Sequence, residues 1–336
     1  MSYTMRSLVR DAAMPLLALA VAAAWPGTSA QADTQTQAWP TKPVKVIVTQ
    51  GAGGTPDIIC RMIAQRLSVA LGRQFIVENR PGAGNTIGAQ AAARAAPDGY
   101  TFLFATAAAL VSNPYTFKSL AYRPMDDFAP VGMVAKGVFF VLAHPSVPAR
   151  NLAELFAYDK QNPGKLTFAT DGPRNFSGIL AAWLNKLGGG SIVQVPYAKM
   201  PQGIEDALAG RVQLIILAVP SAAPYIAAGS LRPLAESFVR RIDNYPDVPP
   251  IADLFPGVEM VGWFAIVAPA KTPPDIIARL NRELDKVLRD PEIVKQLAMI
   301  GFFTEGAGTP EATRDFIHAQ YELWGKVAHD IGLQPE

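Results

Sequence analysis

Residues 44–57 read VKVIVTQGAGGTPD, and this stretch decides the fold class. The apolar and β-branched run at 44–48 predicts a strand, and the glycines that follow it predict a tight loop. Residues 57–71 then carry a helical pattern. A strand, a glycine-rich loop and a helix in this order predict the first unit of an α/β fold.

The same alternation continues along the chain. Strands are expected at 75–77 and 101–105 with a helix at 86–94 between them. A second series of strands alternates with helical stretches near Leu152, Ile179, Ile204 and Ala222, and this pattern predicts βαβ units with largely parallel sheets. The later strands are expected at 138–143, 166–169, 192–195, 212–217, 231–235 and 263–268.

The end of the chain predicts how the domains are arranged. After the strand at 263–268 the pattern is helical, so this tail has no further strands to pair with. We therefore expect residues 261–336 to pack back on a first domain at 42–137, with residues 138–260 inserted as a second domain. The chain then crosses between domains near 134–137 and near 260–262, and two adjacent crossings make a hinge.

The first residues differ from the rest. Arg6 and Arg10 precede an uncharged apolar run at 12–25, and small residues ending at Ala32 follow. This is the three-part layout of a secretory signal peptide, and the run is shorter than the roughly 20 residues that span a bilayer. We expect residues 1–32 to be cleaved on export to the periplasm and 33–41 to form a linker; a retained anchor is the alternative.

Composition excludes several classes of protein. The 336 residues include 30 basic and 28 acidic side chains, and no Lys or Arg run could neutralise a row of phosphates, so no nucleic acid partner is expected. Hydrophobic residues make up 50% of the chain, as in a soluble globular protein. Cys60 is the only cysteine, which excludes an internal disulfide, and its helical setting predicts a small buried thiol.

No catalytic or cofactor motif is complete. The glycine loop lacks the third glycine of a dinucleotide fingerprint, because Pro56 stands in its place. His144, His318 and His329 are poorly placed as bases for a nucleophile, and there is no Gly-x-Ser-x-Gly elbow. No ligand set stands at metal spacing. The sequence therefore predicts a binding protein with no metal and no cofactor, and not an enzyme.

Backbone groups remain as the candidate site. Glycine-rich loops that lead into helices expose N–H groups at the positive end of the helix dipole, and such ends hold carboxylates. Residues 53–57 fit this arrangement, at the carboxyl end of a strand where ligands of open α/β sheets bind. The alternative is that these glycines only satisfy a tight turn, with Asp57 as a helix cap.

Short segments along the chain match a known pattern. In order they resemble the Bug family of periplasmic receptors, the extracytoplasmic components of tripartite tricarboxylate transporters, from Trp39 to the C-terminus. The matches are WPTKPV at 39–44, GGTPD at 53–57, VENRPGAG at 77–84, PDGYT at 97–101, DFAPV at 127–131, PGKL at 163–166, VPY at 195–197, PDVP at 246–249 and APAKTP at 268–273.

The resemblance implies a two-lobed periplasmic binding protein fold that closes like a flytrap. It places a carboxylate ligand in a cleft between the lobes, held mainly by backbone groups and ordered waters. Carried over by position, one loop from each lobe faces the ligand and a strand end lines the floor. The expected ligand-binding residues are Thr49, Gln50, Gly51, Ala52, Gly53, Gly54, Thr106, Thr170, Asp171, Gly172, Arg174 and Asn175.

The chain departs from the family in these loops. The family usually has Pro and Phe where this chain has Thr49 and Gln50. It usually has a small Gly-Ser or Gly-Thr pair followed by His where this chain has Arg174, Asn175 and Gly178. Arg174 is expected either to make a bidentate carboxylate contact or to face solvent at the cleft rim.

The resemblance implies a monomeric receptor that captures a small organic carboxylate and delivers it to the membrane permease subunits of a tripartite tricarboxylate transporter. Two alternatives remain open. One is a receptor that reports ligand occupancy to a membrane sensor, and the other is a periplasmic enzyme on the same scaffold. Aromatic acids, aliphatic dicarboxylates and hydroxy acids all present the required carboxylate, so the sequence leaves the ligand open.

Overall fold

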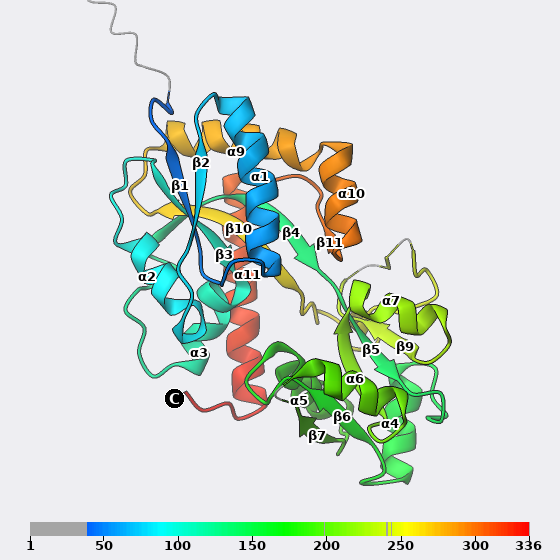
Figure 1. Ribbon diagram of the computed structural model, residues 1–336. Helices are drawn as coiled ribbons and strands as arrows, with labels where there is room; N and C mark the ends of the chain where they lie inside the picture. The colour runs from blue at the N-terminus through cyan, green and yellow to red at the C-terminus, as the bar shows by residue number, and fades with distance from the viewer. Residues whose placement is uncertain (1–38, 198, 240, 243, 336) are drawn as a thin grey trace, which may run out of the picture. The chain divides into compact units, whose positions relative to one another are not determined.

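The computed structural model describes residues 39–197, 199–239, 241–242 and 244–335 (Figure 1). The expected signal peptide at 1–32 and the linker up to residue 38 lie outside these residues. In chain order the elements are β1 (Val44–Val48), α1 (Thr55–Leu71), β2 (Phe75–Asn79), the 3-10 turn η1 (Ala83–Asn85), α2 (Thr86–Ala93), β3 (Thr101–Thr106), the π-helical turn η2 (Ala108–Ser112), α3 (Asn113–Thr116), β4 (Phe128–Gly137), β5 (Phe139–Ala143), α4 (Leu152–Gln161), β6 (Thr167–Thr170), α5 (Phe176–Gly188), β7 (Val193–Pro196), α6 (Met200–Leu208), β8 (Leu214–Ala218), α7 (Val219–Ala227), β9 (Arg232–Glu236), α8 (Ile251–Leu254), β10 (Gly262–Pro269), α9 (Pro274–Leu288), α10 (Pro291–Met299), β11 (Phe302–Phe303) and α11 (Pro310–Asp330).

The strands form two sheets, of order β11-β4-β10-β3-β1-β2 and β7-β6-β8-β5-β9. β1 is parallel to β2 and β3, and β6 is parallel to β7 and β8, as the alternation of strands and helices predicts. β4, β10, β11 and β5 pair antiparallel with all of their neighbours. The α/β class is confirmed, but the expectation of largely parallel sheets is wrong: both sheets are mixed. The strands that carry the chain between the sheets are not joined to their neighbours by a βαβ crossover, so nothing imposes a parallel direction on them.

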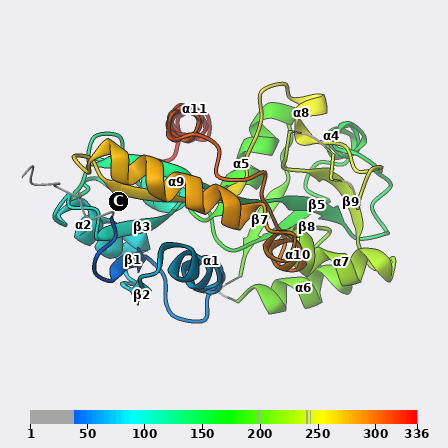
Figure 2. The same ribbon diagram turned by 90° about the horizontal axis from the view of Figure 1, so that it is seen from above.

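The first sheet is covered on both faces, which explains its continuous apolar strands. On β1, Val46 and Val48 belong to a buried core shared with α1 and α9. Ile47, between them, belongs to the core shared with η2 and α11. Seen from above, α1 and α11 lie on opposite sides of this sheet (Figure 2). Alternate side chains of one strand therefore enter two different cores.

The chain passes between the two sheets at adjacent positions. β4 ends at Gly137, β5 begins two residues later, and Gly137 pairs with Gly262 at the start of the returning β10. The predicted hinge positions coincide with this pair. The domain boundaries 42–137, 138–260 and 261–336 remain predictions.

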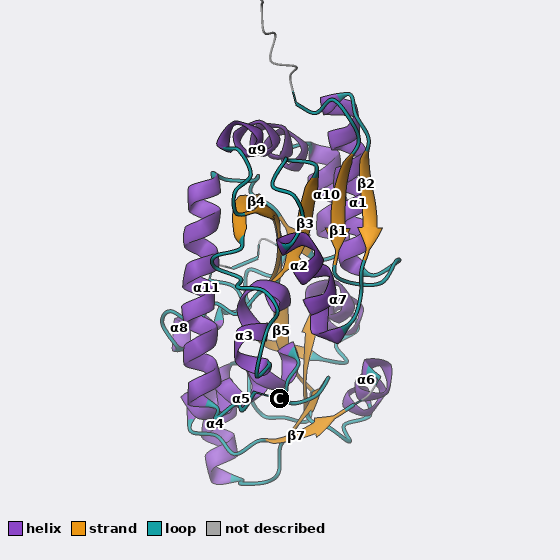
Figure 3. Cartoon of the chain, turned by 90° about the vertical axis from the view of Figure 1, so that its left-hand side faces the viewer, coloured by secondary structure: helices purple, strands orange, loops and turns teal. Residues whose placement is uncertain are grey.

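The C-terminal tail packs mainly on the first sheet. α9 and α11 contact β4, and the tail adds a short strand, β11, that the helical pattern did not predict. α11 runs along the molecule (Figure 3), and its end contacts α5, where Trp183 Nε1 donates to Asp330 Oδ2 at 3.4 Å. Among the residues described, no helix combines the length and apolar character needed to cross a membrane.

Candidate functional site

The glycine-rich loop after β1 is held by Asp57. The Asp57 carboxylate accepts hydrogen bonds from the Gly53 N–H at 2.8 Å, from Arg61 Nε at 2.9 Å and from Asn79 Nδ2 at 2.9 Å. Asn79 Nδ2 also donates to the Gln50 carbonyl at 3.0 Å, so two points of the loop are fixed to one network. Burial of Asp57 would by itself raise the pKa, but the hydrogen bonds from Arg61, Gly53 and Asn79 outweigh it and hold the pKa below its ordinary value.

The loop leaves the N-terminus of α1 uncovered. α1 begins at Thr55 with Gly54 as N-cap and no side-chain capping bond. Gly53 has a φ of +80°, so it is the residue that needs glycine for the turn, and Asp57 binds its N–H as the alternative interpretation predicts. Gly54 has a φ of −74°, which any residue adopts. The turn itself therefore does not require glycine at position 54, and a role for Gly54 in ligand binding remains a prediction.

Two buried threonines end neighbouring strands of the first sheet. Thr49 follows β1 and Thr106 ends β3, which is parallel to β1. Thr49 Oγ1 donates to Asn85 Oδ1 at 2.9 Å. Thr106 Oγ1 accepts the Ala109 N–H at 3.2 Å, a bond that does not use its hydroxyl hydrogen.

The second predicted loop joins β6 to α5. Thr170 is fully buried at the end of β6, with Oγ1 3.5 Å from Gln194 Oε1. The Asp171 N–H donates to Ser177 Oγ at 2.9 Å, and the Ser177 hydroxyl donates to Asp171 Oδ1 at 2.5 Å. Asn175 is the N-cap residue, but its Nδ2 donates to the Asp171 carbonyl and its side chain does not cap the helix. The first turn of α5 is thus a second set of uncapped backbone N–H groups.

Close packing and a hydrogen bond to the C-terminal residues hold the loop at residues 170–175 in place. A Cβ atom at Gly178 would lie 2.0 Å from the Gly172 carbonyl oxygen, so this approach of loop to helix requires glycine. Arg174 Nη1 donates to the backbone carbonyl of Gln334 at 2.9 Å. Arg174 therefore contacts the residues that follow α11, and its contact with a ligand remains a prediction.

The structure gathers the predicted residues into two groups. Residues 49–54 and Thr106 lie at the carboxyl ends of strands in the first sheet, and residues 170–175 lie at the carboxyl end of β6 in the second. This is where ligands bind in α/β sheets. The assignment of these residues to one ligand site remains a prediction.

Cys60 and His144 have structural surroundings that account for them. Cys60 is buried as predicted, and burial raises the pKa of its thiol. His144 Nδ1 lies 2.8 Å from Ser146 Oγ in an exposed turn. The His144 N–H binds the Gln213 carbonyl, just before β8 begins, whereas Thr170 ends β6 at the opposite end of that sheet. Within the described ranges, no group of three His, Cys, Asp or Glu side chains could hold a metal ion.

Comparison with known proteins decides the family. The family model described as the tripartite tricarboxylate transporter family receptor, TctC, matches residues 59–333. The chain belongs to this family. This TctC-family chain is 33% identical to a UPF0065 protein of Bordetella bronchiseptica, over 95% of the chain and 92% of that protein. It is 32% identical to the protein BugT of Bordetella pertussis, over 96% and 98%.

Solved structures confirm the two-lobed receptor fold. An R. palustris protein solved with adipate superposes with a TM-score of 0.72 at 31% identity, over 89% of the chain and 100% of that protein. MatC from Rhodopseudomonas palustris with bound malate has a TM-score of 0.66 at 27% identity, over 86% and 99%. The predicted membership of the Bug and TctC receptors is therefore confirmed, and the family is one of solute receptors rather than enzymes.

The predicted site of this TctC-family protein omitted three polar residues. Asn79 and Asn85 fix the first loop, and Ser177 fixes the second. Asn79 stands at the end of β2, beside β1 in the sheet. Polar residues at the carboxyl ends of neighbouring strands are a signal that could have identified it. Ser177 lies inside the α5 pattern, where nothing in the sequence distinguishes it.

Proposed function

We propose that this protein is a periplasmic receptor that binds a small organic carboxylate and delivers it to the permease subunits of a tripartite tricarboxylate transporter. The family supports the receptor role. The bound adipate and malate of two similar structures support a carboxylate as the ligand. Export through cleavage near residue 32 belongs to the same proposal.

The observation that carries the ligand class is the pair of uncapped helix N-termini. α1 and α5 both begin after a strand of their own sheet, and neither has a side-chain capping bond. The first N–H groups of a helix have no acceptor within it, and the positive end of the helix dipole favours an anion. Thr106 adds a hydroxyl donor at the first sheet. Together these groups offer donors to a carboxylate without a dedicated charged side chain.

A thermal-shift screen of the exported protein tests the ligand class. The panel contains adipate, malate, an aromatic acid such as benzoate, and the matching amides as neutral controls. A carboxylate that binds only the folded protein adds about 2.7 kcal/mol to the free energy of unfolding at a hundredfold excess over Kd, and so raises the melting temperature. No shift with any acid, or equal shifts with the amides, contradicts a carboxylate receptor.

Substitutions at Gly54 test where the acid binds. Because φ is −74° and a Cβ atom there would approach nothing closer than 3.4 Å, Gly54→Ala and Gly54→Val keep the turn. Calorimetric titration of the acid from the screen should show affinity falling from Gly to Ala to Val, while urea unfolding stays unchanged. An unchanged Kd in Gly54→Val would show that the acid does not bind at the first loop, and would leave the proposed ligand class as it is.

A further inference from the structure

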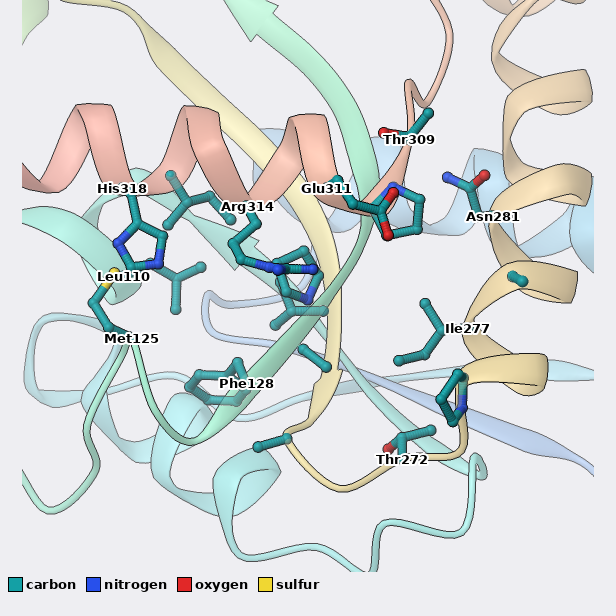
Figure 4. A pocket seen from close by; sticks show the side chains of 18 of the residues that line it. Leu110, Met125, Phe128, Thr272, Ile277, Asn281, Thr309, Glu311, Arg314 and His318 are labelled. Carbon is teal, nitrogen blue, oxygen red and sulfur yellow. The ribbon is translucent and has the colours of Figure 1, made fainter.

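A cavity of about 820 Å³ lies between α9 and α11 (Figure 4). Its volume is in the range of small-molecule sites. β4 begins in its floor with Phe128, which pairs with Pro269 at the end of β10. Thr106 pairs with Phe264, near the start of β10. The cavity is therefore at the opposite end of the first sheet from the carboxylate loops.

Much of the cavity wall is apolar, and a hydrogen-bonded side chain holds it in place. Asn281 Nδ2 donates to the carbonyls of Val131 and Gly308, at 2.8 Å each, and so fixes α9 to β4 and to the segment before α11. Several prolines, whose φ angles are restricted, complete the walls. The apolar lining suits an apolar body. The main apolar lining residues are Leu110, Phe128, Val267, Ile277 and Ile317.

Some polar side chains at the cavity have no partner among the described residues. Arg314 and His318 stand four residues apart on one face of α11 and extend into the cavity (Figure 4). Among the residues that the structure describes, Arg314, Arg282 and His318 have no hydrogen bond or ion pair. Thr272 also lines the cavity, is 3% exposed, and its Oγ1 has no hydrogen-bond partner in the described ranges. This hydroxyl oxygen is closed off from the cavity, so it does not contribute to the binding of a ligand there.

The helix termini at the cavity favour an anion. The charged side chains that line it balance, with Arg282 and Arg314 against Glu311 and Asp126. The N-terminal turns of α9 and α11 also border it, each with the positive end of its helix dipole. A guanidinium such as that of Arg314 offers two parallel donors to a sulfonate or carboxylate.

We propose that this cavity is a second ligand site, for an organic anion with an apolar, ring-sized body. Arg314 binds the anionic group, and Phe128 and Ile277 contact the body. The proposal does not rest on the carboxylate loops, because none of their residues lines this cavity.

Isothermal titration calorimetry with 2-naphthalenesulfonate tests the site. The wild type should bind one equivalent of this probe. Arg314→Gln should weaken binding at least roughly tenfold through loss of a charged hydrogen bond. The matched control is Lys326→Gln, which removes the same charge from the same helix outside the cavity and should leave Kd within about twofold. Ala278→Trp, on the α9 wall, should fill the cavity and abolish binding.

The outcomes separate the two sites. Gly54→Val should bind the probe as the wild type does. Loss of probe binding in Gly54→Val but not in Arg314→Gln assigns the probe to the carboxylate loops and overturns the second site. Absence of saturable binding, or equal weakening by Arg314→Gln and Lys326→Gln, also overturns it. If Ala278→Trp fails to fold by circular dichroism, the exposed Arg314→Gln decides alone.

Discussion

Asp57→Asn should destabilise the protein through the loop network that precedes α1. The carboxylate accepts three donors, from Gly53, Arg61 and Asn79, with its side chain 4% exposed. An amide has one acceptor oxygen, so at least one of these donors would face the new NH2 group. Hydrogen bonds to a charged group contribute roughly 1.5–3 kcal/mol each, and neutral ones about 1. Because Arg61 is half exposed and can be rehydrated, we expect a net loss of about 2–3 kcal/mol at pH 7.

Urea unfolding as a function of pH measures this effect. The folded pKa of Asp57 is depressed, so its contribution is present above the unfolded pKa of about 3.9 and is lost as the pH falls through the folded pKa. The difference in free energy of unfolding between wild type and Asp57→Asn should therefore be largest at pH 7 and should shrink below about pH 4. Ligand affinity should fall too, since Gly53 loses its anchor.

Asp275→Asn is the matched control. It removes a carboxylate from the first turn of α9, where the side chain is exposed and has no hydrogen bond among the described residues. Loss of the helix-dipole interaction alone should cost about 0.3–1 kcal/mol. A loss in Asp57→Asn no larger than in this control, or a difference from wild type that does not change with pH, would refute the network argument.

Three further substitutions test other parts of the molecule. Arg174→Ala should weaken binding of the carboxylate roughly ten- to a hundredfold if a charged hydrogen bond is lost, and an unchanged Kd by calorimetry removes Arg174 from the site. Gly178→Ala should lower the free energy of unfolding in urea by about 1–3 kcal/mol and weaken ligand binding, because its methyl group displaces Gly172. A wild-type free energy of unfolding together with a wild-type Kd would contradict the close packing. Burial raises the pKa of Glu236 to about 7, so its ionisation opposes folding and stability is lost as the pH rises from about 4.5 towards 7. Glu236→Gln should therefore gain on the order of 2 kcal/mol relative to wild type between pH 5 and pH 8, and parallel pH profiles would show that Glu236 ionises freely.

The sequence predicted the βα units because their signals are local. The apolar run of β1 and the helical pattern of α1 lie within one short segment, and the structure extends each by no more than two residues. β4 was missed, since Pro130, Gly132 and Gly137 interrupt the strand pattern. β4 accommodates these residues through contacts with distant parts of the chain: its pairing with β10 shifts register twice, and Gly132 lies against Ala307 of the tail. A short stretch of sequence around β4 contains neither β10 nor Ala307.

The candidate site shows the same division. The Gly53 turn and the hydrogen bond from the Gly53 N–H to Asp57 follow from residues close in sequence. Asn79 reaches Asp57 and Asn85 reaches Thr49 across 22 and 36 residues, through strand order that a single sequence does not specify. Propensity predicts that a loop exists, whereas the hydrogen bonds that shape it depend on which strands are neighbours.

The C-terminal helix bears on how the two sheets can move. Beside the paired crossings at Gly137 and Gly262, α11 makes a further connection, because it packs on β4 and its end contacts α5. The polar links there are weak: Arg174 to Gln334 is exposed, and Trp183 to Asp330 is long at 3.4 Å. Exposed charged contacts contribute about 0–1 kcal/mol, and ligands commonly shift conformational equilibria by more. If the lobes close as the family resemblance predicts, α11 is an element that has to rearrange, because it contacts β4 of the first sheet and α5 beside the second.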